Sequence, residues 1–347
     1  MKKRVKKMMT LSLIGVVMTV ALAGCGNAKK SSKSTASNGK ATKVIIGSQE
    51  MPNDEGIAKA EGYFKEELGV DVEIKQFDSG KDVNTALAAG SIDFGLVGSC
   101  PAALAISQEL GVEMIWIHEV LGSTESLVAR KETGITKIED LKGKTIATPF
   151  ASTGHFSLLH ALENAGLSTN DVNLLDMQPS EIYAAWQNGQ IDATYVWEPT
   201  LSELKDSVTL CTSEDMAKAG YMTSNVELVR SDFAKTNPEL VTAYIKALDK
   251  AATLYQEKET SAVDIISKAM NLDADAAKKQ MEGSTWLNAK EQLGVDYFGS
   301  SDKKGALAKN IYDTAKFLKE QGSIAEMPDE AVFDKAVNPS YIEEAVK

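Results

Sequence analysis

The chain of 347 residues is poor in the side chains from which metal and nucleophile sites are usually built, with three histidines and three cysteines. The cysteines stand at positions 25, 100 and 211, without CxxC spacing, and no segment is rich in histidine. We therefore expect no metal, no cofactor and no metal-dependent catalysis. Cys100 and Cys211 could form one disulfide in an exported protein, and two buried thiols are the alternative that we favour.

Long apolar runs are also missing, except near the start. There MKKRVKKMM precedes LSLIGVVMTVALAGC, a basic stretch followed by an apolar one too short to span a bilayer comfortably. Residues 22–25, LAGC, resemble the lipobox of bacterial lipoproteins. We predict a signal peptide at residues 1–24 and a lipidated Cys25 as the first mature residue. The alternative is plain secretion with Cys25 removed or free.

Positive charge is scarce as well. The chain has 37 basic and 49 acidic residues, a formal net charge of −12, and loss of residues 1–24 removes five basic residues and no acid, leaving −17. Nucleic acid and anionic lipid head groups are therefore excluded as partners, so we expect membrane attachment through the lipid alone. Residues 25–42, rich in Ser, Lys and Asn, are predicted to form a lipidated flexible tether.

An internal repeat is the most informative feature that is present. GSIDFGLVGSCP from Gly90 matches GQIDATYVWEP from Gly189, with Gly90, Ile92, Asp93 and Val97 at a constant offset from their counterparts. Upstream, KVIIGSQ matches KTIATPF, and DVEIKQFDSG matches DVNLLDMQPS. Each copy alternates strands with helices, the helices being expected at 55–68, 81–89 and 102–108, and at 155–165, 181–188 and 200–205.

This alternation predicts an α/β protein of two lobes, each a mostly parallel sheet flanked by helices, with the ligand in the cleft between them. We place lobe 1 at residues 43–124 together with 228–347, including the C-terminal helices, and lobe 2 at residues 125–227. Ligands of open parallel sheets bind at the carboxyl ends of the strands. The loops expected to converge there are GSQEMPND, FDSG and GSCP from the first copy, and PFASTG, QPS and WEP from the second.

The hydroxyl and glycine residues of these loops favour an anion. Gly98 and Ser99 precede one helix and Ser152, Thr153 and Gly154 another, so amides and the positive ends of two helix dipoles would face the cleft. Simple N-capping explains any one loop as well. Glu198, in VWEPT, would match a ligand that also carries an ammonium group, unless it is only a first-turn helix acid.

Other residues complete the candidate site. They are Gln49 as a direct contact, Asp54 as a helix-cap residue with ligand contact second, Phe150 in the PFASTG loop, His155 at a helix start, Trp197 beside Glu198, and Trp286 as a lid. Ser152 and His155 are three residues apart, but no orienting acid and no GxSxG elbow accompany them. We therefore expect a binding protein and not an enzyme.

Several segments together resemble the taurine-binding members of the aliphatic-sulfonate, nitrate and taurine group of ABC-importer substrate-binding proteins. They are KQFDSG, LVGSCPAALAIS, GKTIATPFASTGHFSLLHAL, QPSEIYAAWQNGQIDATYVWEPT and DTAKFLKEQG, in this order along the chain.

The resemblance implies a type II periplasmic-binding-protein fold that delivers its ligand to a membrane permease and its ATPase. By position, Gly98, Ser99, Ser152 and Thr153 would hold a sulfonate and Glu198 would lie close to the amine. Gln49, Trp197 and Trp286 would line the pocket.

The sequence therefore predicts an exported monomer, lipid-anchored at the outer face of the bacterial cell membrane or periplasmic, that binds taurine or a close sulfonate. An unsubstituted alkanesulfonate or another small anion or zwitterion remains an alternative ligand. An enzyme on the same fold, like the thiamine-pyrimidine synthases, and a sensory receptor remain alternative functions.

Overall fold

The computed structural model describes residues 40–347, which belong to one compact unit, Ser34–Lys347. The predicted signal peptide, Cys25 and nearly all of the tether lie outside the described residues, so lipidation stays a prediction. Among residues 40–347, no helix combines the length and the apolar character needed to cross a membrane.

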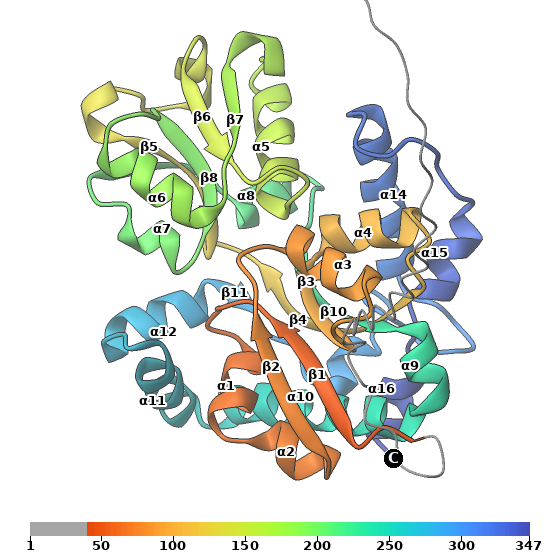
Figure 1. The fold of residues 1–347 in the computed structure, drawn as a ribbon. Helices are drawn as coiled ribbons and strands as arrows, with labels where there is room; N and C mark the ends of the chain where they lie inside the picture. Colours follow the sequence, from red (N-terminus) through yellow and green to blue (C-terminus); the bar gives the residue numbers. More distant parts are fainter. Residues whose placement is uncertain (1–39) are drawn as a thin grey trace, which may run out of the picture. The chain divides into compact units, whose positions relative to one another are not determined.

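The first of two sheets has six strands in the order β11-β4-β10-β3-β1-β2 (Figure 1). Its strands are β1 (Lys43–Ser48), β2 (Asp71–Gln76), β3 (Phe94–Gly98), β4 (Val112–Leu121), β10 (Ser224–Arg230) and β11 (Ser284–Thr285). Strands β1, β2 and β3 are parallel, whereas β10 runs antiparallel to both β3 and β4. The sheet is therefore parallel where the repeat predicted it and antiparallel where the chain crosses and returns.

The second sheet has five strands in the order β7-β6-β8-β5-β9. They are β5 (Glu125–Arg130), β6 (Thr145–Thr148), β7 (Asn173–Asp176), β8 (Ala193–Trp197) and β9 (Ser207–Thr212). Strands β6, β7 and β8 are parallel, and β5 is antiparallel to its neighbours β8 and β9. The order β7-β6-β8 repeats the order β2-β1-β3, so the two copies in the sequence correspond to two equivalent three-strand units.

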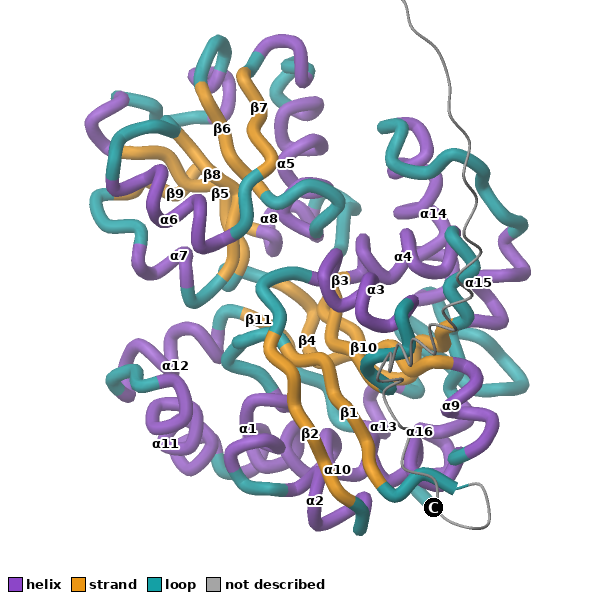
Figure 2. Tube along the Cα trace, viewed as in Figure 1, coloured by secondary structure: helices purple, strands orange, loops and turns teal. Residues whose placement is uncertain are grey.

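Helices lie around both sheets (Figure 2). Those of the first copy are α1 (Asp54–Ala60), α2 (Tyr63–Leu68), α3 (Gly80–Ala88) and α4 (Ser99–Ser107). Those that follow β5 are α5 (Thr153–Asn164), α6 (Pro179–Gln187), α7 (Thr200–Glu203) and α8 (Ser213–Lys218). The single helix expected at 55–68 is two helices, because Gly62 adopts φ +73° between α1 and α2 and interrupts the right-handed backbone.

The remaining helices follow β10. They are α9 (Ser231–Thr236), α10 (Pro238–Glu257), α11 (Glu259–Met270), α12 (Ala274–Glu282), α13 (Ala289–Gln292), α14 (Leu307–Glu320), α15 (Glu330–Ala336) and α16 (Ser340–Ala345). Buried apolar residues of these helices share one hydrophobic core with the first sheet. Tyr244 of α10 illustrates this, because its ring stacks on Phe64 and Phe94. The second sheet has its own, smaller apolar clusters.

Two aspartates occupy equivalent places in the two units. Asp93 Oδ2 accepts a hydrogen bond from the Ile45 amide at 2.9 Å, and Asp192 Oδ2 accepts one from the Thr145 amide at 2.8 Å. Each carboxylate therefore ties the start of the third strand of its unit to the first strand. The constant offset found in the sequence reflects this shared construction.

The chain passes between the sheets twice, between β4 and β5 and between α8 and β10. At the first crossing a Cβ on Gly122 would lie 2.4 Å from the carbonyl oxygen of Gly283, so only glycine fits. The lobe boundaries at 124/125 and 227/228 stay predictions. Strand β10 begins at Ser224 and so extends across the second boundary.

Replacing either Asp93 or Asp192 with alanine should destabilise the fold by about 1.5–3 kcal/mol, the usual contribution of a hydrogen bond to a charged group. The loss arises because the Ile45 or Thr145 amide is left without its acceptor. Urea unfolding followed by fluorescence measures the effect. Asp302→Ala, at an exposed position, is the control. Losses no larger than that of the control would contradict the role of the two carboxylates.

Candidate functional site

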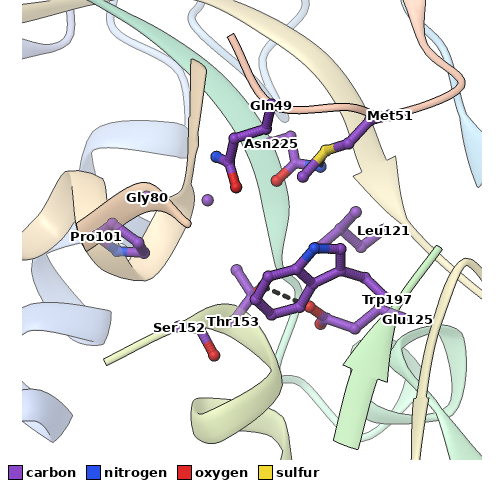
Figure 3. A pocket seen from close by; sticks show the side chains of 11 residues that line it. Gln49, Met51, Gly80, Pro101, Leu121, Glu125, Ser152, Thr153, Trp197 and Asn225 are labelled. Carbon is purple, nitrogen blue, oxygen red and sulfur yellow. Dashed lines mark hydrogen bonds between the residues drawn. The ribbon is translucent and has the colours of Figure 1, made fainter. Parts of the chain in front are cut away.

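A cavity lies where loops of both sheets meet, with about 320 Å³ of space free of atoms, open solvent included. Figure 3 shows its lining, to which both sheets and the crossing segments contribute. The lining residues are Gln49, Met51, Gly80, Gly98, Pro101, Leu121, Glu125, Ser152, Thr153, Trp197 and Asn225. All of them are buried except Trp197, which is partly exposed.

Two helices begin at this cavity from opposite sides. Gly98 is the N-cap of α4 and Ser152 the N-cap of α5, and both residues line the cavity. A Cβ on Gly98 would lie 2.8 Å from Thr153 Cγ2, so glycine at this position allows α4 and α5 to come together. The first amides of a helix lack intrahelical acceptors and carry the positive end of its dipole. The paired helix starts therefore form a site suited to an anion.

The hydroxyl groups at the start of α5 are already used within the protein. Ser152 Oγ donates to the Pro149 carbonyl at 2.6 Å and accepts from the His155 amide at 3.1 Å. Thr153 Oγ1 donates to Glu125 Oε2 at 2.5 Å. These side chains cap and fix the loop, which leaves the amide of Thr153, the α5 residue in the lining, as a donor available to a ligand.

Glu125 is a buried acid in the cavity wall, at the start of β5. Besides the Thr153 hydroxyl, it accepts a hydrogen bond from Ser213 Oγ at 2.8 Å. Burial raises the pKa of Glu125 to about 7, although the two hydroxyls favour its charged form. The group therefore changes charge near neutral pH, and a cation beside it would stabilise its ionised form.

Two amide side chains face the cavity with their oxygens. Gln49 Nε2 donates to the Leu96 carbonyl at 2.9 Å. Asn225 Nδ2 donates to Glu119 Oε1 at 2.5 Å and contacts Met51 Sδ at 3.2 Å. Because the nitrogens have these partners, both amide oxygens remain acceptors, and Figure 3 shows them turned toward the space bordered by Trp197.

Basic side chains are absent from the cavity lining. The remaining donors are helix amides and the indole Nε1 of Trp197, which has no hydrogen-bond partner among residues 40–347. The acceptors are the side-chain oxygens of Glu125, Gln49 and Asn225. Donors and acceptors are thus both present at one cavity. This arrangement suits a small molecule that carries an anionic group and an ammonium group.

Five of the twelve ligand-binding residues predicted from the sequence line the cavity, namely Gln49, Gly98, Ser152, Thr153 and Trp197. The other seven lie outside the lining, and their contacts explain why. Ser99 Oγ accepts from the Ser224 amide at 3.4 Å. Phe150 stacks on His155, whose Nδ1 accepts from the Ala151 amide, and Gly154 packs against Tyr195.

Asp54 belongs to a buried network behind the cavity wall. Its Oδ2 accepts from Trp116 Nε1 at 2.7 Å, and its Oδ1 lies 2.6 Å from His118 Nδ1. The other nitrogen of His118 lies 2.9 Å from Glu227 Oε2. Burial opposes a charge on His118, but the two carboxylates raise its pKa well above the usual value. Asp54 is thus engaged in the core.

Glu198 does not face the cavity either. Its carboxylate accepts from the Ser202 amide at 3.0 Å and the Ser202 hydroxyl at 2.8 Å, which holds the first turn of α7. These contacts agree with the alternative interpretation of Glu198, in which it is an acid that stabilises the first turn of a helix. Trp286 is buried with its ring against Tyr255, at a centroid distance of 4.2 Å, and lies outside the cavity lining, so its role as a lid stays a prediction.

Six lining residues were not among the predicted site residues, namely Met51, Gly80, Pro101, Leu121, Glu125 and Asn225. The first three lie in loops that the repeat indicated, whereas Leu121, Glu125 and Asn225 lie next to the two crossings. An acid at the start of a strand with an apolar centre, ESLVAR, was the available signal for Glu125.

Neither cysteine at positions 100 and 211 is paired, and both are buried. Within residues 40–347, no three His, Cys, Asp or Glu side chains are grouped so as to hold a metal ion.

Comparison with known proteins gives one family and a consistent fold. The model of the family described as NMT1/THI5 like matches residues 56–262. The taurine-binding periplasmic protein of Escherichia coli K12 is 36% identical over 291 residues, which cover 82% of this chain and 88% of that protein.

Solved structures share the fold at lower identity. The alkanesulfonate-binding protein SsuA of Xanthomonas axonopodis pv. citri, bound to MOPS, matches with a TM-score of 0.71 and 21% identity over 86% of this chain and 98% of that one. The desulfurization enzyme DSZB matches with a TM-score of 0.63 and 16% identity over 88% of this chain and 98% of that one. The predicted two-lobed α/β binding-protein fold is confirmed, and the fold alone does not separate binding proteins from enzymes.

Glu125→Gln should change how stability depends on pH. Because the pKa of Glu125 is raised from 4.5 to about 7 in the folded protein, the stabilisation by its protonated form is complete below pH 4.5 and is lost as pH rises through 7. The variant, which cannot ionise here, should lose less stability between about pH 5 and pH 8 than the original protein. Thermal unfolding midpoints across this range measure it, and parallel curves for the two proteins would contradict the raised pKa.

Proposed function

This chain belongs to the NMT1/THI5-like family, and on that premise we propose that it is the substrate-binding protein of an ABC importer that captures taurine or a closely related small sulfonate. The observation that carries the proposal is the cavity itself, which combines the starts of α4 and α5 with acceptors from Glu125, Gln49 and Asn225. Taurine is an ammonium and a sulfonate joined by two carbons, and it needs this pair of environments.

The chemistry of the lining also supports a sulfonate. Three equivalent sulfonate oxygens can each accept from a different helix amide, which compensates for the absence of a basic side chain among the lining residues. The curated relative that is 36% identical carries taurine binding in its name, which agrees with this ligand.

The acid proposed for the amine is Glu125. The sequence analysis predicted Glu198 as the partner of the amine. The Glu198 carboxylate lies outside the cavity lining and accepts from Ser202, whereas Glu125 lines the cavity. At about 4 Å and an effective dielectric near 20, an ammonium–carboxylate pair is attractive by about 4 kcal/mol before desolvation is subtracted. Ionised Glu125 would thus offset the cost of burying the ligand's amine.

Closure of the two sheets about the crossings would complete the site. The sulfonate would lie at the start of α5 and at Gly98 of α4, so neither sheet alone would provide all donors. Closure would also remove water from the charged contacts and strengthen them. The loaded protein would then deliver the ligand to a permease driven by its ATPase, from a lipid-anchored or periplasmic position outside the cell membrane.

An enzyme on this fold is the second candidate, and the match to a desulfurization enzyme is the observation in its favour. A covalent mechanism needs an activated nucleophile with a base in reach. The lining contains no cysteine and no histidine, and its two hydroxyls are donors to Pro149 and Glu125. Binding without turnover therefore agrees better with these contacts.

Calorimetric titration of residues 26–347 should show heat of binding with taurine. In Glu125→Gln, we expect taurine to bind at least tenfold more weakly while ethanesulfonate, which lacks the amine, changes much less, because a neutral amide attracts an ammonium less strongly. Glu198→Gln is the matched control at the other acid. Equal losses for both ligands would remove Glu125 from the amine site, and no heat with taurine or any small sulfonate would refute the proposed function.

Taurine affinity should also increase with pH. The pKa of free Glu125 is about 7, and a bound ammonium favours its ionised form, so binding below pH 7 requires loss of a proton. Affinity should rise toward tenfold per pH unit below that value and level off above it. Titrations between about pH 5.5 and pH 8.5 in buffers of different ionisation heat report the proton release. A taurine affinity that does not change with pH, as is expected for Glu125→Gln, would contradict the coupling of binding to ionisation of Glu125.

A further inference from the structure

A second, outer cavity adjoins the ligand cavity. It holds about 840 Å³ of space free of atoms, including open solvent, and Gln49 and Trp197 line both cavities. The other residues of the outer cavity come from the loop after β1, the end of β2 and the loop FDSG, and from α6, α7 and the residue before α7. They are Glu50, Gln76, Phe77, Asp78, Pro179, Ser180, Tyr183, Pro199, Thr200 and Glu203.

The two shared residues differ in how firmly they are held. Gln49 is buried, and its nitrogen is fixed by the 2.9 Å hydrogen bond to the Leu96 carbonyl. Trp197 is the one lining residue of the ligand cavity that is partly exposed, and no hydrogen bond is described for its indole nitrogen. Its backbone lies opposite Glu125 in the pairing of β5 with β8. Trp197 therefore borders both cavities and lies on the residue position paired with the buried acid.

The outer cavity has a definite charge. Three carboxylates, those of Glu50, Asp78 and Glu203, lie in its lining, and no lysine or arginine does. A ligand that extended into it could present a neutral or cationic end there, whereas a second anionic end would be repelled. The two cavities together thus suit a longer sulfonate whose far end is an amine.

We propose that Trp197 sets the chain length of the ligand, by separating the inner cavity, which accommodates a two-carbon aminosulfonate, from an acidic outer cavity that would accept longer ones. The inference rests on the proposed function. With the indole in place, each methylene beyond two has to displace the ring or Gln49. Without it, the inner and outer cavities join, and the additional methylenes enter space lined by Phe77 and Tyr183.

The test is a calorimetric titration of ω-aminoalkanesulfonates with two to five carbons against the original protein, Trp197→Ala and Trp197→Phe. The original protein should bind taurine best. Trp197→Ala should bind taurine at least tenfold more weakly and gain roughly threefold to fourfold in affinity per added methylene, the gain expected for burying one. Trp197→Phe retains a ring as a wall and should retain the original order of affinities.

Two controls test whether Trp197 acts as a steric barrier between the cavities or only as a direct contact of the ligand. Tyr183→Ala changes only the outer cavity and should leave taurine binding unchanged. Alkane-1,ω-disulfonates should stay weak ligands of Trp197→Ala, because their second anion would meet the three carboxylates. If Trp197→Ala lowers the affinity for aminoalkanesulfonates of every chain length by the same factor, the inference is overturned. If it does not fold, Trp197→Leu replaces it with the same criterion.

The two proposals fail in different ways. Absence of binding by the original protein to every sulfonate in the series would refute the proposed function. Binding of taurine by the original protein, together with an unchanged order of affinities in Trp197→Ala or Trp197→Leu, would refute only the role of Trp197.

Discussion

The close approach of Gly98 to Thr153 governs the cavity, because it brings the starts of two helices from different sheets to one place. With 2.8 Å between Thr153 Cγ2 and the position where a Cβ of Gly98 would lie, no other residue permits this approach without a shift. Since the lining contains no basic side chain, helix amides are the main source of positive potential there. An anion site of this construction exists only while both sheets hold their helices against each other.

Buried polar groups behind the cavity lining support the wall on the first sheet. His118, held between Asp54 and Glu227, connects the start of α1 to β4 and β10. The next residue along, Glu119, accepts from Asn225, which in turn contacts Met51. Burial raises the pKa of Glu119 to about 7, against the effects of His118 and Asn225. Because buried polar groups are costly when unpaired, this network fixes the orientation of the Asn225 oxygen.

The repeat made much of this arrangement predictable from the sequence. Constant spacing of Gly90 and Asp93 with Gly189 and Asp192 indicated two equivalent units, and the rule for parallel sheets pointed to Gly98, Ser152 and Trp197. Contacts that depend on tertiary structure could not be found in this way. The sequence does not show that the Glu198 carboxylate accepts from Ser202, and Glu125 becomes significant only because Thr153 and Ser213 are folded against it.

The absence of basic side chains from the lining has a consequence for encounters in solution. A chain with 49 acidic and 37 basic residues repels simple anions at long range, and the cavity offers them no compensating point charge. A zwitterion has no net charge and is exempt from that repulsion, since it responds to the field only through its dipole. Under the proposed function, discrimination against inorganic anions would therefore begin with their lower concentration near the protein surface, and the capture rate of a zwitterion would change little with ionic strength.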